Sequence, residues 1–168
     1  MNLSKKIIRH FLFFTGAGVI FGVTGGVTEA VLRKIASDNT RGTLQAISFL
    51  GVRGLKDVKE ATVNYGGNDY HIAVVSGLAN ADRLMEQIKS GEKHYDLVEV
   101  MACPGGCISG AGQPYISHRH RAKRGEGLYR TDRISTIKRS QDNPLMDELY
   151  ATVLKGKEHE LLHVSYIK

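Results

Sequence analysis

Cysteine is scarce in this sequence. The 168 residues include only two, Cys103 and Cys107, which lie four positions apart. Two thiols so close together cannot form the disulfide framework on which small secreted proteins depend. The scarcity of cysteine therefore favours a reducing, cytoplasmic setting.

The sequence also lacks an apolar run long enough to cross a membrane. Three basic residues near the amino terminus precede an uncharged stretch from Phe11 to Thr28, which superficially resembles a signal peptide. That stretch contains five glycines and three threonines. It falls short of the roughly 20 apolar residues that a membrane span requires, so we expect no membrane partner and no cleaved signal. Its glycines are not followed by Gly-Lys-Ser/Thr, which disfavours a phosphate-binding loop.

Aromatic residues are missing where nucleic-acid binding would need them. The net charge is +6, which suits an acidic partner. Basic residues are densest between His118 and Arg139, where eight lysines and arginines face only Glu126 and Asp132. Tyr129 is the one aromatic residue in that stretch, so no stacking platform accompanies the charge. We expect a solvated basic surface and no nucleic-acid partner.

The overall composition is that of an ordinary globular chain. Hydrophobic residues make up 42% and charged residues 24% of the sequence, and there is no internal repeat or low-complexity tract. A chain of this length suffices for one domain with a real core. Disordered and fibrous classes are excluded.

Periodicity and turn residues predict an α/β fold. A short apolar strand or turn is expected around Val19 to Val23, and a helix is expected to begin at Gly25-Gly26. A strand, a helix and a second strand in succession imply a right-handed parallel crossover, so we expect a mostly parallel sheet flanked by helices, with a β-hairpin. The later predicted elements are a hairpin with arms Glu60 to Tyr65 and Tyr70 to Val75, a helix from Ala81 to Ser90, a strand from Tyr95 to Met101, and a helix from Asn143-Pro144 to Gly156.

Two of these helices are predicted to bury an apolar face. In the helix from Ala81 to Ser90, the face would consist of Leu84, Met85 and Ile88. In the last helix it would consist of Leu145, Met146, Leu149, Tyr150 and Val153.

The most informative stretch is Val98 to Pro114, VEVMACPGGCISGAGQP. Pro104 stops the preceding strand because proline has no amide proton for a sheet ladder, which places both thiols in a loop at a strand end. Gly105 and Gly106, between the cysteines, remove side chains that would hold the backbone away from a bulky group, and they permit positive φ. Ligands of open α/β sheets gather at such strand ends. The stretch predicts a binding site, although a glycine-rich connection with two inert thiols is the simpler alternative.

Three metal sites are compatible with the residues. The tail segment His159 to His163 reads HELLH, which matches the zinc-protease pattern H-E-x-x-H. The sequence leaves no room for a third zinc ligand downstream. The alternative is a capping helix with Leu161 and Leu162 packed inward. A zinc site from the two cysteines with His118 and His120 has its histidines too close together for a zinc finger. Iron–sulfur ligation suits two thiolates among small residues beside an apolar strand, but two cysteines cannot complete a four-thiolate cluster.

The sequence resembles the iron-only (di-iron) hydrogenases. VMACPGGCISGAGQP is similar to the final cysteine motif of that family, and TGAGVIFGVTGGVTEAVLR is similar to the glycine-rich segment that precedes it in the catalytic domain. The stretch Val52 to Ala61, and the closing NPLMDELY and HELLHVSY segments, also follow the family pattern. The resemblance extends from about Thr15 to the carboxyl end. It implies a partial hydrogenase catalytic domain over residues 15–168 and a non-matching extension over residues 1–14.

This resemblance implies a cofactor and roles for four residues. The family combines protons and electrons into dihydrogen at an H-cluster, a four-iron four-sulfur cubane joined to a di-iron subcluster. By match to the motif, Cys103 would be a cubane ligand and Cys107 would bridge the cubane to the di-iron unit. Met101 and Phe21 would form apolar walls around that unit, which keep an open coordination site from bulk water.

The departures from the family imply an incomplete enzyme. Two earlier cysteine motifs, which supply the other cubane ligands and the proton-transfer thiol, are absent from this sequence, and Ala111 replaces a usual glycine. The resemblance therefore implies a fragment or split subunit that is inactive alone and needs the rest of the catalytic domain as partner. A non-catalytic iron–sulfur cluster-binding module is the alternative. The TGAGVIFG run is more like NAD(P)-linked members, and the basic stretch suits an acidic ferredoxin.

Overall fold

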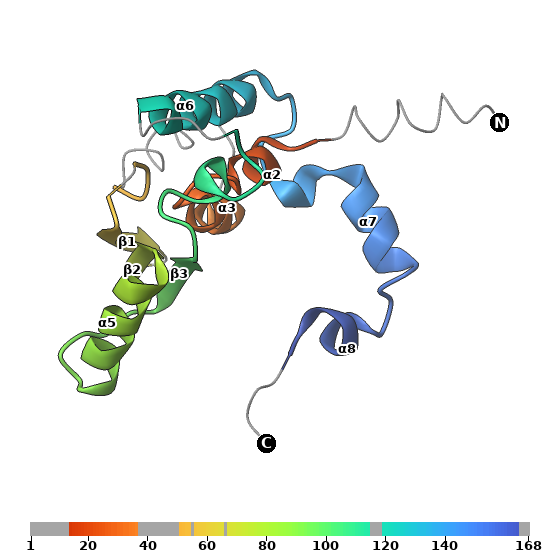
Figure 1. The fold of residues 1–168 in the computed structure, drawn as a ribbon. Coiled ribbons are helices and arrows are strands. Elements are labelled where there is room, and N and C mark those ends of the chain that lie inside the picture. The colour runs from red at the N-terminus through yellow and green to blue at the C-terminus, as the bar shows by residue number, and fades with distance from the viewer. Residues whose placement is uncertain (1–13, 37–50, 55, 66, 115–118, 165–168) are drawn as a thin grey trace.

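The computed structural model describes residues 14–36, 51–54, 56–65, 67–114 and 119–164 (Figure 1). The predicted extension over residues 1–14 lies almost entirely outside this part of the chain. The elements, in order, are α2 (Gly16–Ile20), α3 (Gly26–Ile35), β1 (Val58–Tyr65), β2 (Asn68–Ser76), α5 (Leu78–Lys89), β3 (Leu97–Met101), η1 (Cys107–Ser109), α6 (Arg119–Ile134), η2 (Ser140–Asp142), α7 (Pro144–Ala151) and α8 (Glu158–Leu162).

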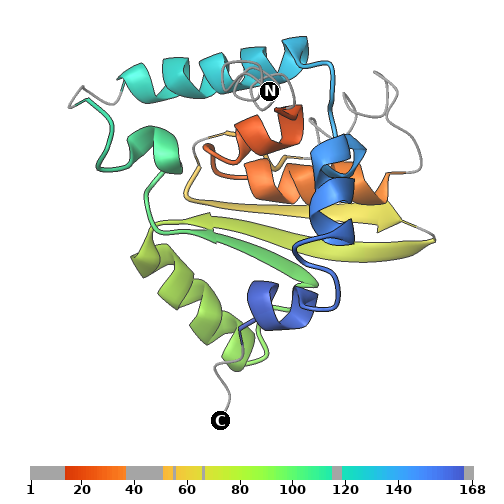
Figure 2. The same cartoon turned by 90° about the vertical axis from the view of Figure 1, so that its right-hand side faces the viewer.

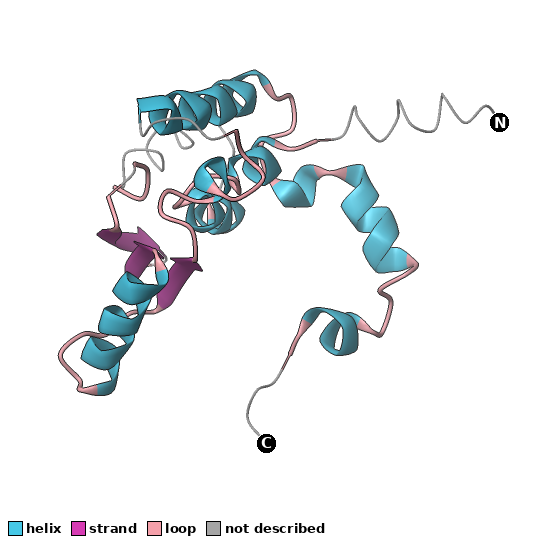
Figure 3. Cartoon of the chain, viewed as in Figure 1, coloured by secondary structure: helices cyan, strands magenta, loops and turns pink. Residues whose placement is uncertain are grey.

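The described strands form one sheet in the order β1-β2-β3 (Figure 3). β1 and β2 pair antiparallel, from Val58 opposite Val75 to Tyr65 opposite Asn68, and β2 and β3 pair parallel through the crossover helix α5. The α/β class, the hairpin and the parallel crossover are confirmed. The prediction of a mostly parallel sheet is wrong: the sheet is mostly antiparallel, with eight antiparallel and five parallel residue pairs. The long β1-β2 hairpin supplies the antiparallel pairs, because a tight turn can join antiparallel strands only.

Helices cover both faces of the sheet, α3 on one and α5 on the other (Figure 2). Successive β2 residues alternate between these faces. Ile72 and Val74 pack with Leu32 of α3, whereas Ala73 and Val75 pack with Ala81 and Leu84 of α5. Successive strand residues point to opposite faces of the sheet, and helices cover both faces here. The residues at the end of β2 are therefore buried without interruption.

The predicted face of α5 is only partly correct. Leu84 is buried, but Met85 is 52% and Ile88 is 37% exposed. Within the residues that the structure describes, the neighbouring sheet has three strands, and a single stripe of the helix, through Ala81 and Leu84, packs on it.

The strand expected around Val19 to Val23 is wrong, because helix α2 ends at Ile20. The alternative of a turn is confirmed for residues 21–23. Thr15 caps α2, since its Oγ1 accepts a hydrogen bond from Gly18 N at 3.0 Å. The backbone then turns, and α3 begins at Gly26 as predicted. Ile20 and Val23 pack with Ile108 from the cysteine loop, forming a third small cluster of buried residues.

A buried ionic cluster joins α3 to α6. The Arg33 guanidinium donates to Asp132 Oδ1 and Oδ2 at 2.8 and 2.7 Å, and to Glu29 Oε1 at 2.6 Å. Arg53 donates to both oxygens of Glu29 at 2.7 Å, and its guanidinium stacks 4.2 Å from the ring centre of Tyr129. Burial alone lowers the pKa of Arg33, but the bonds to Asp132 and Glu29 overcome it and raise that pKa above its ordinary value.

The carboxyl-terminal helices differ from their prediction. Asn143 caps α7, accepting from Leu145 N at 3.0 Å, with Pro144 in the first turn. However, no residue of α7 is buried, the helix ends at Ala151 before Gly156, and Val153 is 65% exposed. Helices α7 and α8 lie to one side of the sheet and its covering helices (Figure 1), so the predicted face is covered only in part. Leu145, Met146 and Leu149 are half-buried, whereas Tyr150 is exposed. No helix of the described residues is long and apolar enough to cross a membrane.

Candidate metal centre

The two cysteines lie in a tight loop directly after β3. The strand ends at Met101, as predicted, where Gly77 N donates to the Met101 carbonyl at 2.8 Å. Gly105 and Gly106 have φ of 88° and 91°, and Gly106 N donates to the Cys103 carbonyl at 2.9 Å. Both thiols are free; Cys103 is half-buried and Cys107 is exposed.

The turn that carries Phe21 is bonded to this loop. Thr24 N donates to the Gly105 carbonyl at 3.2 Å, and Ile108 N donates to the Gly22 carbonyl at 3.1 Å. Two motifs about eighty residues apart in the sequence are therefore neighbours in space. The structure brings together the segments of all four predicted site residues, with Met101 half-buried and Phe21 45% exposed.

Glycine is required where these two segments meet. A Cβ added to Gly106 would lie 2.9 Å from both the Gly22 carbonyl oxygen and Thr24 N, and 3.0 Å from Met101 Sδ. The missing side chain therefore lets the cysteine loop and the Phe21 turn touch through their backbones.

A buried carboxylate that sequence reasoning missed fastens the Phe21 turn to β3. Glu99 accepts hydrogen bonds of 2.7 Å from Gly25 N, Thr28 N and Thr28 Oγ1, at the amino terminus of α3. A carboxylate there satisfies unpaired amides and complements the helix dipole. Its signal in the sequence was an acidic residue in the middle of an apolar strand.

Lys59 holds the same turn from β1. Its ammonium group donates to the Thr24 and Gly54 carbonyls, each at 3.0 Å. Burial lowers the pKa of Lys59 to about 8, although the negative charge of Glu99 raises that pKa in part.

The lowered pKa of Lys59 predicts a pH dependence of stability. Between about pH 8 and 10.5 the unfolded chain binds a proton at this position that the folded chain has lost, so the free energy of unfolding should rise with pH. Lys59→Met should remove this rise. Urea unfolding of both proteins at about pH 7 and pH 9.5 measures the difference. An equal pH response in the two proteins would contradict the assignment.

Arg124 fastens the far side of the cysteine loop to α6. Its guanidinium donates to the Ile108 carbonyl at 2.8 Å and to the Pro114 carbonyl at 2.9 Å. The sequence placed Arg124 in a solvated basic surface. Proximity of α6 to the loop is a tertiary contact, and periodicity gives no signal for it.

The described residues do not form the metal site expected within His159 to His163, and the zinc site that includes His118 stays a prediction. No group of three or more histidine, cysteine or acidic side chains within the described ranges is placed to hold a metal ion, and His118 lies outside those ranges. His159 lies within α8 and His163 directly follows it, with the two ring centres 4.9 Å apart. The alternative with Leu161 and Leu162 packed inward is wrong, since these residues are 54% and 52% exposed.

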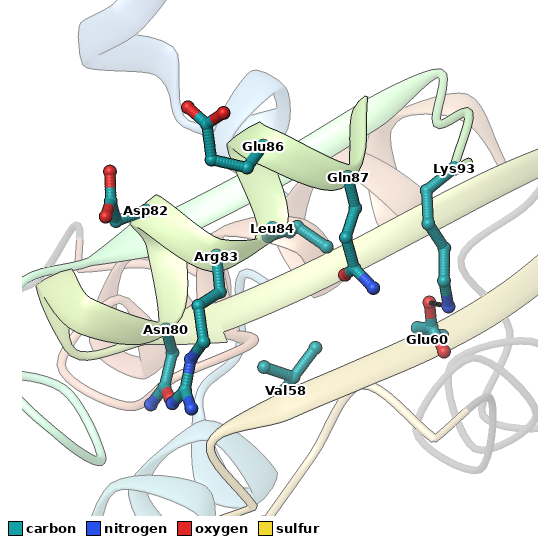
Figure 4. Close-up of a pocket in the computed structure, with 9 residues that line it drawn as sticks. All are labelled: Val58, Glu60, Asn80, Asp82, Arg83, Leu84, Glu86, Gln87 and Lys93. Carbon is teal, nitrogen blue, oxygen red and sulfur yellow. Dashed lines mark hydrogen bonds and ion pairs between the residues drawn. The ribbon is translucent and has the colours of Figure 1, made fainter. Parts of the chain in front are cut away.

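A cavity of about 500 Å³ lies elsewhere, between α5 and β1 (Figure 4). Lys93 donates to Glu60 at 2.7 Å across one end, and Arg83 pairs with Asn80 at the other. No residue of the cysteine loop lines this cavity. It is therefore separate from the thiols.

The fold and the loop together define an α/β protein with two free thiols in a glycine-rich loop at the end of a strand. A family model described as "Iron only hydrogenase large subunit, C-terminal domain" matches residues 4–111, and one described as "Iron hydrogenase small subunit" matches residues 118–168. The chain belongs to the iron-only hydrogenase family, which confirms the resemblance. The first match begins within the segment 1–14 that was expected to differ; the boundary at residue 14 stays a prediction.

Individual relatives agree with this assignment. Iron hydrogenase 1 of Clostridium pasteurianum is 37% identical over 165 residues, 92% of this chain and 29% of that protein. Subunit HndD of the NADP-reducing hydrogenase of Solidesulfovibrio fructosivorans is 44% identical over 160 residues, 92% of this chain and 27% of that subunit. Cytosolic iron-sulfur assembly component 3 of Pongo abelii is 33% identical over 153 residues, 86% of this chain and 31% of that protein.

A solved structure shares the fold as well. An FeFe-hydrogenase studied for stepwise H-cluster assembly aligns with a TM-score of 0.62 and 33% identity, over 87% of this chain and 46% of that chain. The chain thus corresponds to the carboxyl-terminal part of the hydrogenase large subunit. It spans less than a third of the length of the relatives named above.

Proposed function

We propose that this chain supplies one part of an iron-only hydrogenase catalytic domain and acts together with the remaining part. The observation that carries the proposal is the bonded contact between the Phe21 turn and the cysteine loop. Reversible hydrogen oxidation requires thiolates and an apolar shield in one place, and this contact holds the backbones of both segments together.

The residues present fit one side of an H-cluster site. Cys103 and Cys107 are free thiols of the kind that ligate iron–sulfur clusters, and Gly105 and Gly106 leave a backbone without side chains between them. Such a cluster, once bound, supplies the electron transfer and proton reduction. Cys103 would hold the cubane, and Cys107 would bridge it to the di-iron subcluster.

The chain's own residues would orient and shield this group. Met101 and Phe21 would exclude water from the open iron position, because thioether and phenyl groups offer no hydrogen bonds to water. Glu99, Lys59 and Arg124 fix the backbones of the two segments that carry these side chains. Since two cysteines fill only half of the protein ligands of a cubane, we expect no stable cluster in this chain alone.

Cluster reconstitution with a partner tests the proposal. The full chain is mixed anaerobically with the upstream part of subunit HndD, ferrous iron and sulfide, and visible absorption and iron content are measured. We expect a cluster in the mixture and little cluster with either chain alone. In the mixture, Cys103→Ser or Cys107→Ser should reduce the bound iron by about tenfold or more. A mixture that yields neither cluster absorption nor, after di-iron loading, hydrogen evolution would overturn the proposal. Zinc in place of iron by elemental analysis would do the same.

A non-catalytic cluster-binding module is the second candidate. The similarity to cytosolic iron-sulfur assembly component 3 favours it. A module of this class needs no di-iron subcluster. Carbonyl or cyanide infrared bands in a purified complex would therefore exclude this candidate.

The electron partner and the location belong to the same proposal. An acidic ferredoxin or an NAD(P)-linked chain would bind the basic surface of α6. Arg121 and Lys123 would contribute to this surface, whereas Arg124 is bonded to the cysteine loop. The two free thiols suit a reducing, cytoplasmic location. Both statements stay predictions.

A further inference from the structure

A cavity of about 270 Å³ beside the cysteine loop carries an excess of basic side chains. We call it the arginine cavity, because its lining includes Arg53, Arg121 and Arg133. Glu126 is the one acidic residue among the lining residues, and it is exposed, so water screens its charge. The charge of the lining therefore favours a negatively charged ligand.

The arginine cavity lies between α6 and three other segments of the chain. Val23 comes from the Phe21 turn, Ile108 from the cysteine loop, and Arg53 from the segment before β1. A Cβ added to Gly125 of α6 would lie 3.5 Å from both Ile108 Cδ1 and Val23 Cγ1, so the helix packs closely on these two segments. The α6 residues of the lining follow one stripe of the helix, with a spacing of four residues: Arg121, Gly125, Tyr129 and Arg133.

Two of the lining arginines have no partner within the described part of the chain. Neither Arg121, which is half-buried, nor Arg133 forms an ion pair or a hydrogen bond there. Among the described arginine side chains, Arg130 alone shares this property, and it is exposed outside the cavity. The other described arginines each bond to an oxygen: Arg33, Arg53, Arg83, Arg124 and Arg139. The unpaired guanidinium groups are therefore concentrated at this cavity.

Arg53 and Tyr129 offer further hydrogen-bond donors to the cavity. The bonds from Arg53 to Glu29 use Nε and Nη2, which leaves Nη1 for another acceptor. Burial raises the pKa of Tyr129 to about 12, so its hydroxyl stays protonated at neutral pH and can donate. Guanidinium groups bind the oxygens of phosphates and carboxylates through paired, charge-assisted hydrogen bonds. The donors in the cavity match acceptors of this kind.

We propose that the arginine cavity binds a small molecule with two or more anionic oxygen groups, either phosphates or carboxylates. Arg121 and Arg133 are twelve residues apart on α6, which separates their Cα atoms by about 18 Å. A ligand with separated anionic groups contacts both arginines more readily than one compact ion does. The volume lies just below the roughly 300–1,000 Å³ of sites for drug-sized ligands, so the ligand is small. The inference goes beyond the proposed function, since it involves neither thiol and no cluster.

Calorimetric titration of the full, iron-free chain tests the proposal, with pyrophosphate and citrate as probes at about pH 7 and fixed ionic strength. We expect saturable binding of at least one probe, and the comparison distinguishes phosphate from carboxylate recognition. Arg121→Gln and Arg133→Gln should each weaken this binding by about tenfold or more, because each removes charge-assisted hydrogen bonds. Tyr129→Phe should weaken it by about two- to tenfold. Arg133 is exposed, so Arg133→Gln tests the site even if the half-buried Arg121 is needed for folding.

Arg130→Gln is the matched control, because it removes the same charge from the same helix outside the cavity. It should change the affinity by less than about twofold. An equal weakening in Arg130→Gln would show attraction to the basic helix as a whole and would overturn the proposal, as would a lack of saturable binding of both probes. A hexaglutamate peptide that binds more tightly than either probe would instead assign the cavity to an acidic protein segment. None of these outcomes depends on cluster formation, so they leave the test of the proposed function separate.

Discussion

Asp132→Ala is expected to lower the free energy of unfolding by about 3–5 kcal/mol, because Asp132 belongs to a buried ionic cluster. The change removes the carboxylate that pairs with both terminal nitrogens of Arg33, whose side chain is 2% exposed. Glu29 would then face Arg33 and Arg53 alone, and a buried guanidinium would lose two of its bonds. Removing one partner of a buried ion pair leaves an uncompensated buried charge, which is far more costly than losing a surface pair.

Urea unfolding of the wild type and of Asp132→Ala measures this loss, and Glu86→Ala is the control. Glu86 pairs with Lys89 on the exposed side of α5, with both side chains about two-thirds exposed. Its removal should change the free energy of unfolding by less than about 1 kcal/mol. A loss at Asp132 no larger than that at Glu86 would show that the cluster does not join α3 to α6.

The fold was predictable where local pattern determines structure. The hairpin arms alternate around turn residues, and the start of α7 is marked by Asn143-Pro144. The mistakes concern tertiary context. The apolar face of α7 is at most half-buried in the described part of the chain, and Met85 lies beyond the reach of the sheet described there. Periodicity reports which face could be buried, but it does not report whether a neighbour exists.

Some residues of the candidate site could be predicted from the sequence, and others could not. The thiols and their glycines could be predicted because their chemistry is readable from residue type and spacing. Glu99, Lys59 and Arg124 could not, since each acts on a segment between 10 and 74 residues away in the sequence.

Gly106→Ala is expected to disrupt the cysteine loop and to prevent cluster binding. The residue has φ of 91° and ψ of −164°, a backbone conformation that is essentially restricted to glycine and costs an alanine about 1–3 kcal/mol. The new Cβ would also lie 2.9 Å from two backbone atoms of the Phe21 turn, and such overpacking costs about 1–3 kcal/mol. We expect a loss of about 3 kcal/mol in the free energy of unfolding.

Because the neighbouring atoms belong to backbone, the strain cannot be relieved by a side-chain rotation. The loop must move away from Gly22 and Thr24, which separates Cys107 from the segment that carries Phe21. Gly112→Ala is the matched control in the same motif: a Cβ there meets nothing within 4 Å and φ is not positive, so stability should change by less than about 1 kcal/mol. Iron content after reconstitution separates the two effects. If Gly106→Ala were to bind iron as well as Gly112→Ala does, the close contact between the two motifs would not be what holds the thiols in position for the cluster.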